Sequence, residues 1–331
     1  FANYGTAIQE NMVHLMEHFA SSVPPPNPMF GQLWYDTVNK EMKVWENTPP
    51  PQWVLLNIHS LQAIAEQLVP NRLYVSKSGN DNNTGRSWFA SKRTIKAACD
   101  TAALLIQSGG VESDHVCIMV ASGEYEEECP IAVPTGASVV GDTQRSVTVR
   151  PVNPNSDVFY LNSGCYVYGL TVRAHVLSPT ALDITPITAK YNANASNQNL
   201  AISTTQTGWA FGFAPGSTIV VSPYIQNCAS ISGDPLTDSG PYPGGGGVLV
   251  DPRVCSLLGT SNRENTIIVD SFTQINLGGI GYKVLGTGSV EISNSTVNFC
   301  QFGILCVDGG RATALASDCG FGNYAMWSQG Y

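Results

Sequence analysis

The sequence predicts a mainly β protein built as a solenoid, in which the chain winds in coils of short strands. From Arg72 onward, short runs rich in Val, Ile and Tyr recur, each bounded by Gly, Pro, Asn or Asp. The pattern of residues 274–280 returns at 298–304, and the tetrapeptide 300–303 returns at 319–322. Repeats spaced 19 to 24 residues apart and made of short strands are typical of a solenoid rather than a sandwich.

The composition excludes two classes of function. Only 12% of the 331 residues are charged and the net charge is −9, without a basic run, so nucleic acid is not an expected partner. No apolar stretch approaches the roughly 18 residues needed to span a bilayer, which argues against membrane insertion. The low charge also leaves few groups for acid–base chemistry, which favours a scaffold over an enzyme.

The first 71 residues predict three short segments before the solenoid. Residues 1–28 comprise a helix from about Thr6 to Ala20 and a proline-rich linker, expected to serve docking or oligomerisation. Residues 29–57 form a small Trp-rich β module, with a hairpin that turns at 36–40 and three tryptophans for its core. Residues 58–71 are a helical linker.

Residues 72–331 are assigned to the solenoid, with a projecting loop region around 174–266 where the strand rhythm weakens. A helix is expected from 94 to about 106. The strands expected are 73–75, 116–120, 131–133, 138–140, 147–149, 158–161, 166–172, 209–213 and 218–221. The chain ends at Tyr331 inside what the pattern predicts to be a further coil, so we expect a longer parent protein or a partner there.

No catalytic, cofactor-binding or metal-ligating residue is assigned from the sequence, and no cofactor is expected. Nine cysteines without a Cys-x-x-Cys pair predict reduced, core-forming thiols. His14 and His18 have the i, i+4 spacing of a metal pair but lack a third ligand. The five histidines, which lie outside any triad motif, are 14, 18, 59, 115 and 175.

Three further clusters were weighed as sites. The acidic run Glu124, Glu126, Glu127 and Glu128 predicts a solvated turn, with cation binding as the alternative. A loop with Asp234, Asp238, Asp251 and Arg253 offers lyase-type groups without ligand spacing. Glycines 244–247 lack the Lys-Ser/Thr that follows a phosphate-binding loop.

Two stretches carry a family resemblance. Residues 72–172, with Thr94-Ile95-Lys96-Ala97-Ala98 and Gly169-Leu170-Thr171-Val172, resemble the start of a pectate-lyase-like right-handed parallel β-helix. The phrases at 31–37, 222–228 and 270–276 resemble virion structural proteins of T-even-like myophages, particularly those infecting cyanobacteria. These phrases read Gly-Gln-Leu-Trp-Tyr-Asp-Thr, Ser-Pro-Tyr-Ile-Gln-Asn-Cys and Asp-Ser-Phe-Thr-Gln-Ile-Asn.

The resemblance implies a structural component of a phage tail: a fibre, spike or baseplate-peripheral protein that serves attachment and host-surface recognition. It implies a homotrimer that contacts other tail or baseplate proteins through its N-terminal region, with host-surface glycan as a further partner. The location is then the virion tail, assembled in the host cytoplasm. The alternative is a polysaccharide-degrading tailspike, a lyase or glycoside hydrolase, on the same β-helix.

The sequence favours the structural role over the enzyme. Galacturonase-like hydrolases of the resembling fold carry paired aspartates and a Gly-His-Gly tripeptide, and neither occurs in this chain. Two carboxylates suffice for a glycosidase, but 25 acidic residues supply many accidental pairs. We therefore expect that the chain is not an enzyme.

Overall fold

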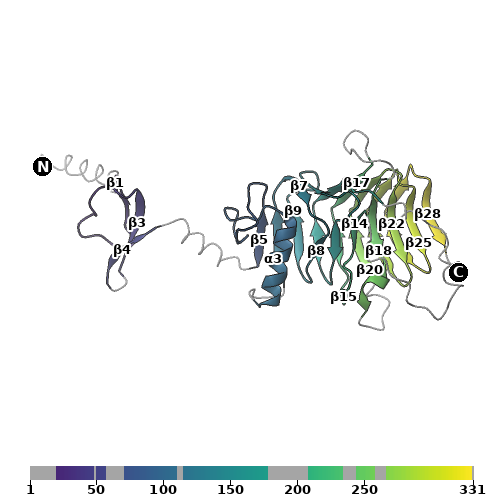
Figure 1. Cartoon of the computed structure of the whole chain (residues 1–331), viewed down its shortest axis with the longest axis horizontal. Coiled ribbons are helices and arrows are strands. Elements are labelled where there is room, and N and C mark those ends of the chain that lie inside the picture. The colour runs from purple at the N-terminus through teal and green to yellow at the C-terminus, as the bar shows by residue number, and fades with distance from the viewer. Residues whose placement is uncertain are drawn as a thin grey trace, which may run out of the picture. The chain divides into compact units, whose positions relative to one another are not determined.

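The chain folds into two units, Phe1–Val69 and Pro70–Tyr331, each considered by itself below (Figure 1). The structure is a computed structural model. It describes residues 20–47, 50–56, 71–109, 115–177, 208–233, 244–257 and 266–329. His14, His18, Asp234 and Asp238 lie outside the described residues, as do the two helices expected near 6–19 and 60–68.

The first unit contains a four-stranded sheet. Its strands, in spatial order, are β1 (Ala20–Ser21), β2 (Leu33–Asp36), β3 (Glu41–Glu46) and β4 (Gln52–Leu55). The predicted hairpin is confirmed as β2 and β3, and its turn is held by Asp36, whose Oδ1 accepts hydrogen bonds from the amides of Val38 and Asn39. Ala20 pairs with Tyr35 in parallel, so the helix expected to reach Ala20 does not include it.

Three tryptophans replace a conventional core in this small sheet. Trp53 contacts Trp34 and Trp45 edge to face, with ring centroids 5.4 Å apart in each pair. Lys43 lies over the ring of Trp34 and forms a 2.9 Å ion pair with Asp36. Because a sheet this short buries little apolar area, these aromatic contacts supply most of its packing.

The second unit is a right-handed parallel β-helix, as predicted (Figure 1). Its strands form three parallel sheets, I, II and III, and each full coil contributes one strand to each sheet. Sheet I contains, in order, β5 (Arg72–Val75), β6 (Cys117–Val120), β9 (Ser138–Gly141), β12 (Tyr166–Tyr168), β16 (Tyr224–Gln226), β20 (Thr266–Asp270), β23 (Ser289–Ser293) and β26 (Arg311–Leu315).

Sheets II and III follow the same order of coils. Sheet II contains β7 (Gly123–Glu127), β10 (Val147–Pro151), β13 (Thr171–Arg173), β17 (Ala229–Ser232), β21 (Thr273–Asn276), β24 (Thr296–Asn298) and β27 (Asp318–Gly320). Sheet III contains β8 (Ile131–Val133), β11 (Phe159–Leu161), β14 (Trp209–Phe213), β18 (Gly246–Val250), β22 (Ile280–Leu285), β25 (Phe302–Val307) and β28 (Tyr324–Gln329). A small pair, β15 (Thr218–Ile219) and β19 (Ser256–Leu257), and the 3₁₀ helix η1 (Pro252–Val254) lie beside them.

The interior is a continuous column of apolar side chains. Successive strand residues point to opposite faces of a sheet, so every second side chain enters the coil. Val139, Val167 and Ile225 occupy matching inward positions in sheet I and are fully buried. On sheet III, Phe159 and Phe211 stack with centroids 5.4 Å apart. Burial of these matched side chains is the main source of stability of the unit.

The corner between sheets I and II has the same backbone in five successive coils. Residues with positive φ, between +49° and +70°, occur there, a conformation that favours Gly and Asn. These residues are Gly169, Asn227, Ser271, Asn294 and Ala316. Gly169 is required for a second reason, since a Cβ there would lie 2.8 Å from the carbonyl oxygen of Gly141 in the previous coil.

The helix α3 (Ile95–Gln107) packs on the first coils, as the sequence predicted (Figure 1). Its buried side chains are Ile95, Ala98, Cys99 and Ala102. Thr94 is the N-cap, and its hydroxyl accepts a hydrogen bond from the amide of Ala97. Among the described residues, no helix is both long and apolar enough to cross a membrane.

Three details of the sequence prediction are wrong. Residues 166–172 form two strands rather than one, because Gly169, with φ of +70°, turns the chain. The predicted loop region 174–266 contains β14 to β19, which continue the coil. The repeat in the last coils is 22 residues in sheet III, where Ile280 pairs with Phe302 and Phe302 with Tyr324, rather than 19 or 24.

The glycines of β18 make the interior selective for the smallest residue, which a substitution can test. A Cβ on Gly247 would overlap Gln274 Oε1, so Gly247→Ala is expected to lower the free energy of unfolding by about 3 kcal/mol. Gly216→Ala is the control, because a Cβ there meets open space and only the positive φ costs about 1 kcal/mol. Equal losses in urea unfolding of the two variants would contradict this account of the packing.

Candidate functional site

The outer surface of sheet I carries a group of tyrosines that the coil brings into register. Tyr166 and Tyr168 project outward from β12, because Val167 between them points into the core. On the next coil Tyr224 pairs with Tyr166 and Gln226 with Tyr168, and Gln226 then pairs with Asp270 of β20. We call these five residues, Tyr166, Tyr168, Tyr224, Gln226 and Asp270, the tyrosine face.

The three rings of the tyrosine face lie close together. The centroids of Tyr166 and Tyr224 are 5.6 Å apart with planes tilted by 44°. Those of Tyr166 and Tyr168 are 6.1 Å apart with an interplanar angle of 26°. All three side chains are partly exposed. They therefore present apolar ring area and phenol groups at one place on the surface.

A chain of hydrogen bonds links the rings to a carboxylate. Tyr166 Oη donates to Gln226 Oε1 over 2.5 Å, and Gln226 Nε2 donates to Asp270 Oδ2 over 2.9 Å. Asp270 Oδ1 accepts from Ser293 Oγ at 2.9 Å and Asn294 Nδ2 at 3.0 Å. The chain fixes the orientation of the amide and the carboxylate before any ligand binds.

The electrostatics of the tyrosine face keep the phenols neutral and the carboxylate ionised. Partial burial, together with Tyr168 and Tyr224, raises the pKa of Tyr166 to about 12. Hydrogen bonds from Asn294, Gln226 and Ser293 lower the pKa of Asp270. At neutral pH the face therefore contains neutral hydroxyl groups, an amide and one negative charge.

A second carboxylate lies on the same outer surface. Glu291 of β23 pairs with Ile268 and projects outward, one coil beyond Asp270 and one position to the side. Strand spacing and rise place the two Cα atoms about 8 Å apart. Paired acidic groups that flank a bond are the usual equipment of glycoside hydrolysis.

The acidic run at 124–128 lies in strand β7 rather than in the predicted solvated turn. Glu124 and Glu126 project outward, and Glu124 forms a 2.6 Å ion pair with Arg150. Glu127 points inward and is 1% exposed. Its two carboxylate oxygens accept hydrogen bonds from the amides of Ile95 (2.7 Å) and Lys96 (3.1 Å), so this residue caps α3 from outside the helix.

The other groups weighed from the sequence are structural. Arg253 pairs with Asp251 at 2.7 Å, and Asp251 caps η1. Gly246 and Gly247 belong to β18 rather than to a projecting loop, because Gly246 lies against the ring of Trp209. All nine cysteines are free, and Cys99, Cys165, Cys228 and Cys300 are buried. No group of three or more metal-ligating side chains occurs within the described ranges.

A buried polar cluster inside the coil contains a serine beside a histidine. Ser230 Oγ lies 3.1 Å from His175 Nε2, but that nitrogen also lies 3.0 Å from the carbonyl oxygen of Gly246. A carbonyl only accepts, so Nε2 carries the hydrogen and cannot take a proton from the serine. Burial lowers the pKa of His175 to about 4, and both side chains are inaccessible. The pair therefore joins coils and is no nucleophile.

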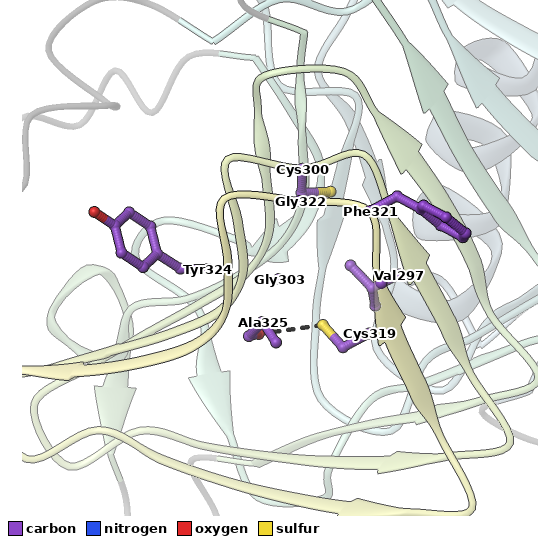
Figure 2. A pocket seen from close by; sticks show the side chains of 9 residues that line it. Val297, Cys300, Gly303, Cys319, Phe321, Gly322, Tyr324 and Ala325 are labelled. Atoms are coloured by element: carbon purple, nitrogen blue, oxygen red, sulfur yellow. Dashed lines mark hydrogen bonds between the residues drawn. The ribbon is translucent and has the colours of Figure 1, made fainter.

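A pocket lies at the last coils, between β24 and β28. Figure 2 shows the rings of Phe321 and Tyr324 directed away from it on opposite sides, with Cys319 Sγ directed at the carbonyl of Ala325. Burial raises the pKa of the Cys300 and Cys319 thiols, so neither is a thiolate at neutral pH. Its lining residues are Val297, Cys300, Gly303, Cys319, Gly320, Phe321, Gly322, Tyr324 and Ala325. The pocket offers no charged group to a ligand.

Comparison with known proteins reveals similarity in structure alone. No protein-family model matches the chain, and no curated protein matches it in sequence. A pectin methylesterase solved with a hexasaccharide is 13% identical, covers 77% of this chain and 80% of its own, and has a TM-score of 0.36. The pectin methylesterase PemA of Erwinia chrysanthemi is 14% identical over the same shares, with a TM-score of 0.36.

A phage protein is also similar. ORF18 of Geobacillus virus E2 is 10% identical, covers 92% of this chain and 72% of its own, and has a TM-score of 0.31. Likenesses this distant do not transfer an activity or a substrate. The resemblance to myophage virion proteins stays a prediction.

The expectation that the chain is not an enzyme is corrected by these comparisons. Pectin methylesterases, which are enzymes, are among the solved structures similar to it. Sparse charge and missing hydrolase motifs were therefore insufficient grounds for excluding catalysis. Whether a carboxylate such as Asp270 acts on a substrate is a question for the assay described below.

The sequence analysis missed the tyrosine face. The only local signal is alternation: Tyr-Val-Tyr at 166–168 and Tyr-Ile-Gln at 224–226 each place two polar or aromatic side chains on one side of a strand. That the two triplets are neighbours depends on the register of coils 58 residues apart, since Tyr166 pairs with Tyr224. Spacing in the sequence did not reveal that pairing.

The buried Glu127 predicts a pH dependence of stability. Burial raises its pKa from 4.5 to about 7, against the two amide hydrogen bonds that favour ionisation. Between these pH values the folded protein keeps a proton that the unfolded chain releases, so the free energy of unfolding falls as the pH rises. Glu127→Gln is expected to remove up to about 3 kcal/mol of that fall.

Urea unfolding at a series of pH values between these limits measures the effect. Glu126→Gln is the matched control, because Glu126 is on the same strand but exposed, and it should retain the wild-type slope. A Glu127→Gln variant whose stability changes with pH as much as wild type would contradict the assignment.

Proposed function

We propose that this chain is a polysaccharide-active protein of a phage tail, with a glycan of the host surface bound on the tyrosine face. The observation that carries the proposal is the grouping of three tyrosine rings with an oriented amide and an ionised carboxylate on one exposed sheet surface. The resemblance of its sequence phrases to virion proteins supports the phage context.

The chemistry of the tyrosine face suits a sugar. A pyranose ring has an apolar face of C–H groups and a rim of hydroxyls, so it requires ring area for stacking and oriented hydrogen-bond partners beside it. Tyr168 and Tyr224 supply ring area, and the neutral phenols supply donors. Gln226 and Asp270, already oriented, supply acceptors at little further entropic cost.

The proposal includes action on the bound glycan. Asp270 and Glu291 are the carboxylates on this surface, and hydrolysis of a glycosidic bond needs two such groups. A homotrimer, attached to other tail proteins through the N-terminal unit, is the assembly expected for a protein of this kind. Light scattering of the purified chain tests it, and a stable monomer would contradict the trimer.

Tyr166→Ala is expected to weaken glycan binding at least about tenfold, because it removes a ring and the donor to Gln226. Titration calorimetry with polysaccharide from a cyanobacterial cell envelope measures the affinity. Tyr160→Ala is the control, since Tyr160 projects from sheet III, a different surface. Failure of the wild-type protein to bind any envelope glycan would overturn the proposal.

Turnover is measured on the same mixture by assaying new reducing or unsaturated ends. Asp270→Asn and Glu291→Gln should each abolish product release, whereas Glu124→Gln on sheet II should not. Binding of the wild-type protein without any product would overturn the catalytic part and leave a recognition protein.

A further inference from the structure

A second aromatic pair lies on the same sheet as the tyrosine face. Tyr74 projects outward from β5, and its ring lies 4.7 Å from that of Trp88, with planes tilted by 54°. Trp88 is 45% exposed. The pair therefore presents an accessible aromatic surface at the first strand of sheet I.

The segment that bears Trp88 is held in place by the sheet. The amide of Tyr74 donates to the carbonyl oxygen of Gly85 at 2.7 Å, and the amide of Lys92 donates to the carbonyl oxygen of Tyr74 at 2.9 Å. Residues on both sides of Trp88 are thus bonded to β5. The aromatic pair is preorganised rather than carried on a free loop.

The register connects this pair with the tyrosine face. Tyr74 pairs with Met119, Met119 with Val140, and Val140 with Tyr168, all on the outer surface of sheet I. Three strand steps separate Tyr74 from Tyr168, which is about 14 Å along the axis of the solenoid. Two aromatic platforms therefore lie in one row, with smaller side chains between them.

The surface between the platforms has no ionisable charge at neutral pH. The outward residues of β6 and β9 are Cys117, Met119, Ser138 and Val140. Burial raises the pKa of Cys117, so its thiol stays protonated. The charged outward groups of the two columns lie at the ends: Arg72 at one end, and Asp270 and Glu291 at the other.

From these observations we infer that the glycan site extends from the tyrosine face to Tyr74 and Trp88 and takes an uncharged polysaccharide lying along the solenoid axis. The inference rests on the proposed function. An uncharged polymer gains stacking contacts at both platforms and loses no ion hydration between them. A polyanion would meet no cation on the middle strands and would be repelled at Asp270 and Glu291.

Binding of fragments of graded length tests the extension. Neutral envelope polysaccharide is cut by partial acid hydrolysis, and the affinity of each fragment is measured by calorimetry. For wild type the affinity should rise with length until a fragment reaches both platforms. Trp88→Ala should cancel that rise, a loss of about tenfold for long fragments, and should leave short fragments unchanged.

Two variants control for folding. Trp88→Phe keeps a ring and should restore most of the gain with length. Phe89→Ala alters the neighbouring side chain, which is 93% exposed, and should behave as wild type. If Trp88→Ala binds long fragments as tightly as wild type does, or weakens short and long fragments equally, the extension is overturned.

Charge is tested with the acidic fraction of the same polysaccharide and with a carboxymethylated neutral fraction. Both should bind more weakly than the neutral fraction at low salt, and tighter binding of either would overturn the inferred ligand class. These outcomes are distinct from failure of the proposed function, in which the wild-type protein binds none of the fragments.

Discussion

In-register pairing of parallel strands from coil to coil is the interaction on which the rest of the second unit depends. Each strand is hydrogen-bonded to the strands one coil before and one coil after it, so a side chain is placed by its counterpart in the neighbouring coil. A slip of one residue would exchange Tyr166 for Val167 on the outer surface and expose the core. The apolar interior therefore fixes the position of every outward group.

The same constraint explains why the tyrosine face is ordered without being in the core. Tyr166, Tyr224, Gln226 and Asp270 come from three coils, yet they form one chain of contacts because their strands share a register. The left-handed corner residues Asn227 and Ser271 bring the chain into the next sheet at the same point in successive coils. A rigid scaffold with adaptable outer residues is suited to recognition of an extended polymer.

Much of the fold followed from local patterns. The strands at 131–133 and 209–213, the helix near 95–107 and the hairpin with its turn at Asp36 were predicted because alternation, caps and turn residues are properties of short segments. Glu127 was misplaced because its carboxylate binds the amides of Ile95 and Lys96, more than 30 positions away. Gly246 and Gly247 were misplaced because what they contact, Trp209 and Gln274, decides their role.

The sequence by itself determined that this is a β-solenoid of low charge, with a Trp-rich module before it, since strand alternation and turn chemistry are written in neighbouring residues. Only the tertiary structure decided which coils are neighbours and in what register. That choice depends on the packing of side chains that are 22 to 58 positions apart, such as Phe302 on Tyr324 and Tyr166 on Tyr224. The tyrosine face and its row to Trp88 arise from that packing, and a linear pattern does not contain them.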